Sequence, residues 1–342
     1  MELPHGKIPV DVLKEIVFKN LGSKRKEVIL GPSLGVDGAV IDVGHRSMIV
    51  SMDPITGALD RIGWLAVNVN ANDVATFGVE PAFLFSCILL PEGAKTKTIE
   101  TICIQMDKAA ENLGMAIVGG HCEITPELVN PIVVGCAMGI TKKGNYVTAA
   151  GAKRGDKLIL TKTAGIEGTA ILATDRKKQL EKAIGSSVLE KAQRMFSQIS
   201  IVKEAVVAYR TGGVNAMHDP TEGGVAGGIH EMADASRLGV RVFESEIMIS
   251  PDTDRICGFL GIDPLMLIAS GALLISSKPQ SADQIVQVLE KEDIHASIIG
   301  EFTENPRERV IVDRKGKTKP LERPLSDHLW KALAKNRPRN GF

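Results

Sequence analysis

The first half of the chain combines two hydrophobic patterns, one with a helical period and one typical of buried strands. Apolar residues recur every three or four positions from Ile99 to Leu113, and Gly114 follows, which predicts an amphipathic helix that ends at a glycine. Similar spacing predicts helices over residues 9–21 and 62–77. Apolar segments between these helices predict strands at 39–43, 47–53, 83–90, 116–118 and 132–140.

The second half shows a new series of strands and helices after a polar, Gly- and Ala-rich stretch at 142–155, which predicts a domain junction there. A glycine-bearing turn is expected at Ala164–Gly168, and Pro320 and Pro324 mark a linker to a short helix near 326–334. The strands are expected at 157–161, 215–218, 240–243, 272–276 and 310–313, and the helices at 187–209, 223–237 and 282–291. Strands and helices do not alternate strictly, so the pattern predicts an α+β fold rather than a doubly wound parallel one.

Composition bounds the class of protein. A length of 342 residues favours two domains, and 44% hydrophobic with 24% charged residues is ordinary for a globular chain. The 41 basic residues balance 41 acidic ones, so net charge gives no reason to expect a nucleic-acid or membrane partner. Five cysteines without a Cys-x-x-Cys pair, and no apolar segment at the start, favour free thiols and a cytoplasmic location.

Acidic residues stand at turns and strand ends in the first domain. Asp37 lies between glycines before a strand, Asp53 ends a strand, and Asn72–Asp73 interrupts an otherwise apolar helix. Local turn chemistry explains the first two equally well. Adjacent Asn and Asp are poor helix formers, so the third pair favours a ligand or a buried polar network. Carboxylates in such positions are the ligands that Mg²⁺ prefers.

Two further motifs are candidates for function. Gly119-Gly120-His121-Cys122-Glu123 follows a short predicted strand, so its side chains are expected at a strand end, although a tight turn is the simpler interpretation. Residues 218–224, His-Asp-Pro-Thr-Glu-Gly-Gly, precede a helix whose first turns hold four glycines, and Asp219 or Thr221 could cap it. Glycines weaken a helix, which makes sense where backbone must approach an anion. Neither a Walker A motif nor a Gly-x-Gly motif occurs.

In this order the segments resemble the ATP-dependent superfamily of aminoimidazole ribonucleotide (AIR) synthase, which also includes thiamine-monophosphate kinase, selenophosphate synthetase and the hydrogenase maturation factors of the HypE family. Gly35-Val-Asp37-Gly38-Ala-Val-Ile looks like its Gly-Asp-Asp-Ala-Ala-Val turn, and the segment from Asn72 to Pro81 looks like its Asn-Asp helix. Asp219-Pro-Thr-Glu-Gly-Gly is most similar to the Asp-Pro-Thr-Arg-Gly-Gly of HypE proteins, as are 261–265 and 270–275.

The resemblance implies a two-domain α+β fold and a homodimer in which N-terminal mixed sheets form a barrel. Its expected parts are an N-terminal segment over the nucleotide site (1–36), two AIR synthase-like domains (37–150 and 151–318) and a linker, short helix and mobile tail (319–342). It implies ATP and Mg²⁺ as cofactors, with Asp37, Asp53 and Asp73 on the metal. The nucleotide would contact Gly35, Asp37, Gly38, Asn72, Gly119 and Gly120, and the acceptor chemistry would involve Asp219, Thr221, Glu222 and His121.

The expected reaction is ATP-dependent phosphorylation of an amide-like or related oxygen, on a small molecule or a maturation partner protein. The chain departs from the pattern of the superfamily in two places. His121 and Val36 occupy positions where the superfamily has acidic residues, and residues 338–342, Pro-Arg-Asn-Gly-Phe, differ from the Pro-Arg-Ile-Cys that ends HypE proteins. Two alternatives therefore remain: an assembly factor that binds nucleotide or partner without turnover, and an enzyme centred on His121–Cys122.

Overall fold

A computed structural model describes residues 3, 8–33 and 35–334. These residues form two compact units. Lys24–Pro32 and Asp37–Tyr146 make up one of them, here called the six-stranded unit, and the other described residues make up the seven-stranded unit. The tail at 336–342, expected to be mobile, lies outside the described residues. No helix in the described part of the chain is both long and apolar enough to cross a membrane.

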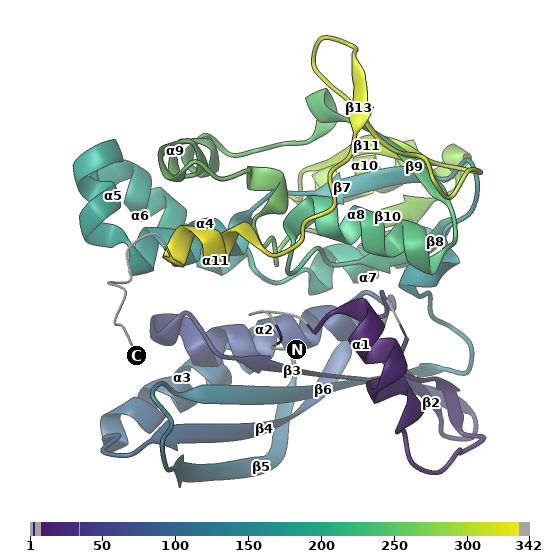
Figure 1. The fold of residues 1–342 in the computed structure, drawn as a ribbon. Coiled ribbons are helices and arrows are strands. Elements are labelled where there is room, and N and C mark those ends of the chain that lie inside the picture. The colour runs from purple at the N-terminus through teal and green to yellow at the C-terminus, as the bar shows by residue number, and fades with distance from the viewer. Residues whose placement is uncertain (1–2, 4–7, 34, 335–342) are drawn as a thin grey trace. The chain divides into compact units, whose positions relative to one another are not determined.

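The six-stranded unit is a mixed sheet with two helices on one face (Figure 1). The strand order is β1-β2-β3-β6-β4-β5, in which only β4 and β5 run parallel. The strands are β1 (Val28–Leu30), β2 (Ala39–Asp42), β3 (Arg46–Ile55), β4 (Pro81–Pro91), β5 (Ala116–Thr125) and β6 (Ile132–Lys142). The helices are α2 (Ile62–Ala75), which packs on β3 and β6, and α3 (Thr96–Asn112), which packs on α2 and β5.

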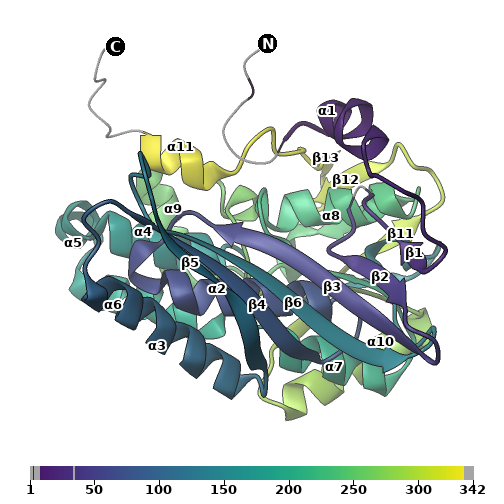
Figure 2. The same cartoon turned by 90° about the horizontal axis from the view of Figure 1, so that it is seen from below.

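The other face of this sheet carries no helix of the unit, and Figure 2 shows the strands from that side with α2 behind them. Apolar side chains remain exposed on strands β3, β4 and β6, among them Met52, Phe83, Phe85 and Ile140. This sheet surface is called the open face below. An exposed apolar area of this kind is characteristic of an interaction surface.

The seven-stranded unit is built on a sheet of order β13-β12-β9-β11-β7-β10-β8, in which only β12 and β9 are parallel. Its strands are β7 (Lys157–Thr161), β8 (Val214–His218), β9 (Gly239–Phe243), β10 (Leu274–Ser277), β11 (Ala296–Thr303), β12 (Arg309–Val312) and β13 (Thr318–Pro320). Its helices are α1 (Val10–Glu15), α4 (Ile166–Asp175), α5 (Lys177–Ile184), α6 (Ser186–Arg194), α7 (Val202–Thr211), α8 (Gly224–Ala235), α9 (Pro251–Leu260), α10 (Pro279–Lys291) and α11 (His328–Ala334). The central strands β7 and β10 are almost wholly buried and form its core.

The α+β class is confirmed, as are the helices of the first domain at 62–77 and 99–113 and the strands between them. The prediction of one helix over 187–209 is wrong, because α6 and α7 are separate. Between them the Lys162 ammonium donates to the carbonyl oxygens of Gln198 (3.0 Å) and Ser200 (2.7 Å), which therefore do not serve a continuous helix. The elements α5, α9 and β11 were not predicted from the sequence. The turn expected at 164–168 already becomes α4 at Ile166.

Candidate functional site

Three segments of the six-stranded unit meet at the Ser51 hydroxyl. The Ser51 Oγ lies 2.7 Å from a carboxylate oxygen of Asp73 on α2 and 2.7 Å from the carbonyl oxygen of Asp37, just before β2. A hydroxyl has one proton to donate, so at any moment it satisfies only one of these two acceptors. Asp73 is only 5% exposed. The arrangement concentrates acidic and carbonyl oxygens, the hard ligands that suit Mg²⁺.

Asn70 fastens α2 to β3 one helical turn before Asp73. Its side-chain oxygen accepts from the Asp53 backbone N–H at 2.8 Å, and its side-chain nitrogen donates to the Asp53 carbonyl at 3.2 Å and to the Ala66 carbonyl at 2.8 Å. A Cβ on Gly135 of β6 would come within 2.4 Å of that nitrogen, so the glycine makes room for the amide. Asn70 thereby sets the position of Asp53 relative to α2.

Sequence reasoning selected Asn72, Asp73, Asp53 and Asp37 but did not assign roles to Ser51 and Asn70. The available signal was the spacing of Asn70 and Asp73, since residues three apart lie on one face of a helix. Asn72 is fully buried, one position away from that face. Hydrogen bonds of Ser51 and Asn70 join the segments that carry Asp37, Asp53 and Asp73, through the Asp73 carboxylate and the backbone of the other two. The three carboxylates do not form a close group among the described residues.

Gly38 owes its identity to packing within the same unit. A Cβ there would stand 2.8 Å from the Val50 carbonyl oxygen and 3.4 Å from the Phe77 ring. The close approach is therefore to β3. Gly35 has a positive φ of 67° and lies against Glu231 and Ala235 of α8 in the seven-stranded unit.

The expectation that Gly119–Glu123 emerges at a strand end is wrong, because β5 continues to Thr125 and pairs in parallel with β4 throughout this segment. His121 pairs with Cys87, and a Cβ on Gly119 would meet the ring of Phe85 at 3.0 Å, so both residues lie on the open face. The His121 Nε2 is 3.0 Å from a carboxylate oxygen of Glu123. This hydrogen bond is the main cause that lowers the pKa of the Glu123 carboxyl.

This placement separates two groups of expected site residues. Asp53 pairs with Gly135, whose Cβ would point into α2, so Asp53 lies on the helix-covered face. Within one copy of the unit the sheet therefore stands between His121 and Asp53. Cys122 follows His121 in the strand and pairs with buried Ile88, so these neighbours face opposite sides. This geometry does not support a joint His121–Cys122 centre.

The second motif forms the passage from β8 to α8 in the seven-stranded unit. Asp219 is 1% exposed, Thr221 donates its N–H to the Asp219 carbonyl at 2.9 Å, and the helix begins after Gly223 with φ of 85°. The N-cap position of α8 is Gly223, and not Asp219 or Thr221 as the sequence predicted.

The cap at α8 comes instead from Asp327, in the segment before α11. Its Oδ2 accepts from the Gly223 N–H at 2.7 Å and its Oδ1 accepts from the Leu329 N–H at 2.7 Å. Burial raises the pKa of Asp327 to about 6 even though these backbone hydrogen bonds oppose the shift. Its distance along the chain, 104 residues, explains why local sequence could not reveal this cap.

Packing also accounts for the glycines at the start of α8. A Cβ on Gly224 would lie 2.4 Å from the Leu267 carbonyl oxygen, and one on Gly228 would lie 2.8 Å from Pro220. The first turn of α8 is therefore pressed against the segment around Leu267 and against its own preceding loop. Glu222 remains partly accessible at this turn.

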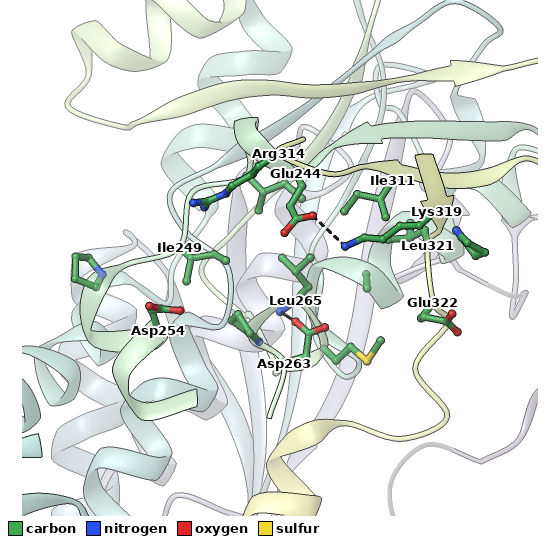
Figure 3. Close-up of a pocket in the computed structure, with 16 residues that line it drawn as sticks. Glu244, Ile249, Asp254, Asp263, Leu265, Ile311, Arg314, Lys319, Leu321 and Glu322 are labelled. Carbon is green, nitrogen blue, oxygen red and sulfur yellow. Dashed lines mark hydrogen bonds and ion pairs between the residues drawn. The ribbon is translucent and has the colours of Figure 1, made fainter. Parts of the chain in front are cut away.

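A cavity of about 830 Å³ lies in the seven-stranded unit, beside the start of α8 and the 264–266 turn (Figure 3). Its wall mixes apolar side chains with charges. Glu244 is paired with Lys319 at 3.1 Å, and Asp263 accepts from the Leu265 N–H at 2.9 Å. Asp254, Arg314 and Glu322 also line it. A volume of this size suits a small organic molecule.

Comparison with known proteins defines the class of this fold and site. The N-terminal domain model described as AIR synthase related protein matches residues 35–141, and the corresponding C-terminal domain model matches residues 153–313. The chain belongs to the AIR synthase related protein family.

Similar curated proteins include a hydrogenase expression/formation protein and a carbamoyl dehydratase. It is 27% identical over 329 residues to a protein of Methanocaldococcus jannaschii provisionally named a hydrogenase expression/formation protein, covering 94% of this chain and 95% of the relative. It is 28% identical over 253 residues to carbamoyl dehydratase HypE of Cupriavidus necator, covering 73% of this chain and 70% of that protein.

Solved structures share the fold. A chain of a HypE–HypF complex superposes with a TM-score of 0.76 at 22% identity, covering 92% of this chain and 99% of that one. HypE in complex with ATP superposes with a TM-score of 0.72 at 21% identity, covering 96% of this chain and 98% of that one. The two-domain AIR synthase-like fold expected from sequence is confirmed.

Proposed function

We propose that this chain is an ATP-dependent enzyme of the HypE type, which phosphorylates an amide-like or related oxygen of a small molecule or a partner protein. Family membership supports the proposal, together with a relative named carbamoyl dehydratase HypE and a shared fold with HypE in complex with ATP. Dehydration of a carbamoyl group requires that its oxygen leave, and phosphorylation by ATP makes oxygen a good leaving group. Catalysis of this kind depends on positioning and charge neutralisation.

The observation that carries the proposal is the oxygen cluster around Ser51. Asp37, Asp53 and Asp73 would hold Mg²⁺, which would neutralise phosphate charge. Ser51 holds the Asp73 carboxylate and the Asp37 backbone, and Asn70 holds the Asp53 backbone. We assign nucleotide contacts to Gly35, Gly38, Asn72, Gly119 and Gly120. Asp219, Thr221, Glu222 and His121 are our candidates for the acceptor side.

We further propose that the open face pairs with the same face of a second copy. Phe85 is 42% exposed there, and packing against a second sheet would cover it. Because His121 and Gly119 lie on this face, a dimer is also the arrangement that would give them a role. A maturation partner protein is the other expected contact, since one similar structure is a HypE–HypF complex.

Release of inorganic phosphate from Mg-ATP tests the proposal, with water or an added carbamoyl compound as acceptor. We expect turnover by the wild type and a loss of about 100-fold or more in Asp73→Asn, which keeps the shape of the side chain but removes its charge. Asp107→Asn, on an exposed position of α3, is the matched control and should retain full activity. Nucleotide binding without any phosphate release would favour the assembly-factor alternative instead.

A further inference from the structure

The cavity of the seven-stranded unit carries more charge than its own ion pairs neutralise (Figure 3). Its ionisable lining residues are Glu244, Asp254, Asp263, Arg314, Lys319 and Glu322. Lys319 is paired with Glu244 at 3.1 Å. Within the part of the chain that the structure describes, the other side chains of this set form no ion pair. Three carboxylates therefore stand against one guanidinium, and the wall has an unneutralised negative charge.

Asp263 is held in place before any ligand arrives. Its backbone N–H donates to the His328 Nδ1 at 2.9 Å, and its Oδ1 accepts from the Leu265 N–H at 2.9 Å at the start of the 264–266 turn. Its second carboxylate oxygen, Oδ2, accepts no hydrogen bond from the described residues. A carboxylate that is already fixed loses little freedom when it binds a ligand, which favours affinity.

Asp254 is positioned by the start of α9. Ser250 caps this helix, since its Oγ accepts from the Thr253 N–H at 3.0 Å. Figure 3 shows Asp254, Asp263 and Glu322 along one side of the cavity, while the two basic side chains come from the opposite side. The negative charge of the wall is therefore spread along one side and is not concentrated at a point.

The wall between these two sides is apolar. Ile249 and Leu265 lie there in Figure 3, and Ile247, Met266 and Ile311 also line the cavity. Ile247 and Ile311 are each only 3% exposed, so they belong to the core beneath the cavity. The hydrocarbon part of a ligand would be covered by this wall, and burial of apolar surface favours binding.

The arrangement does not suit a metal ion. A divalent cation needs several oxygen ligands within about 2.0 to 2.6 Å of one point. Asp254, Asp263 and Glu322 do not form a close group of that kind among the described residues. An anionic ligand is disfavoured as well, because like charges placed together cost binding energy. The complementary ligand carries several positive charges along an apolar chain.

We propose that this cavity binds a linear aliphatic polyamine, with protonated amines at the carboxylates and methylene groups against the apolar wall. The inference goes beyond the proposed function, because the site lies within the seven-stranded unit and requires no nucleotide. A single exposed ion pair is worth little, so affinity comes from several charges on one chain. A volume of about 830 Å³ accommodates such a chain together with water.

The test is calorimetric titration of spermidine into the full chain, without nucleotide. An ionic strength of about 50 mM keeps the screening of charges modest. We expect a saturable heat with one ligand per chain and a Kd of roughly 10 to 100 µM. Octanediol with terminal hydroxyl groups, a neutral chain of the same length, should give no heat.

The variants separate the charge of the wall from its shape. Asp263→Asn keeps an oxygen that can cap the 264–266 turn and removes only the charge. It should weaken spermidine binding by about tenfold, as expected for the loss of a hydrogen bond to a charged group. Arg314→Ala should strengthen binding by about threefold, because it removes a like charge from the wall. Asp283→Asn, exposed on α10, is the matched control and should bind as the wild type does.

The absence of saturable heat up to about 10 mM spermidine would overturn the proposal. Equal affinity of Asp263→Asn and the wild type would also overturn it, and Asp254→Asn on α9 replaces that variant if it does not fold. Complete displacement of spermidine by an equal concentration of Mg²⁺ would show that charge alone accounts for binding, which contradicts a polyamine site. None of these outcomes bears on the proposed function, which phosphate release from Mg-ATP tests separately.

Discussion

At the residue scale, the candidate site depends on side chains that hold other residues in place. Asn70 satisfies both backbone groups of Asp53, and the Ser51 hydroxyl stands between Asp73 and the Asp37 carbonyl. Ligands that come from three separate segments can meet at one cation only if their backbone positions are fixed. The polar residues of α2 and β3 supply that rigidity.

Asn70→Ala should therefore both destabilise the six-stranded unit and weaken its binding of Mg-ATP. Its loss leaves the partly buried Asp53 N–H and carbonyl oxygen without their side-chain partner, which costs about 2 kcal/mol. Urea unfolding measures the stability, and titration of Mg-ATP measures the site. Asn112→Ala, at the exposed end of α3, is the control, and an equal effect in both variants would contradict the bracing role.

The residues of this site were only partly predictable. Asp73 was visible because a carboxylate in an apolar helix conflicts with local preferences. Asn70 is also a poor helix former, but its partner Asp53 lies 17 residues earlier on strand β3. A contact of this kind depends on the tertiary structure and cannot be predicted from the local sequence.

At the element scale, β5 decides which surfaces the sheet offers. The sequence predicts that this strand ends at Val118, because Gly119-Gly-His-Cys-Glu shows no hydrophobic alternation. In the structure, parallel pairing with β4 supplies the backbone hydrogen bonds that the side chains do not promote, and the strand runs on to Thr125. The capping of α8 also depends on a residue distant in sequence, because Asp327 accepts the hydrogen bond at the start of this helix.

Phe85→Glu should abolish the proposed dimer without unfolding the chain. The substitution places a charge on the open face, where a second copy would have to desolvate it, whereas in the single copy Phe85 is already 42% exposed. Light scattering after size-exclusion chromatography gives the mass of the particle. Val129→Glu, 84% exposed outside the strands of the same unit, should leave the mass unchanged. A wild-type protein of monomeric mass would contradict the dimer.

At the scale of the whole molecule, the two units divide the expected tasks. The six-stranded unit holds Asp37, Asp53 and Asp73, and the seven-stranded unit holds the Asp219–Glu222 loop and the cavity of about 830 Å³. The two-domain α+β fold followed from ordered motifs along the chain, which survive where individual helix boundaries do not. Family membership agrees with that order over residues 35–141 and 153–313.

The central claim is that this chain binds Mg-ATP through Asp37, Asp53 and Asp73 of the six-stranded unit. Calorimetric titration of Mg-ATP into wild-type protein and into Asp73→Asn tests it most directly. We expect a saturable heat with Kd in the range of about 1 to 100 µM for the wild type, equivalent to roughly 5 to 8 kcal/mol of binding free energy, and its loss in the variant. Equal binding by the two proteins, or no heat from either, would contradict the claim.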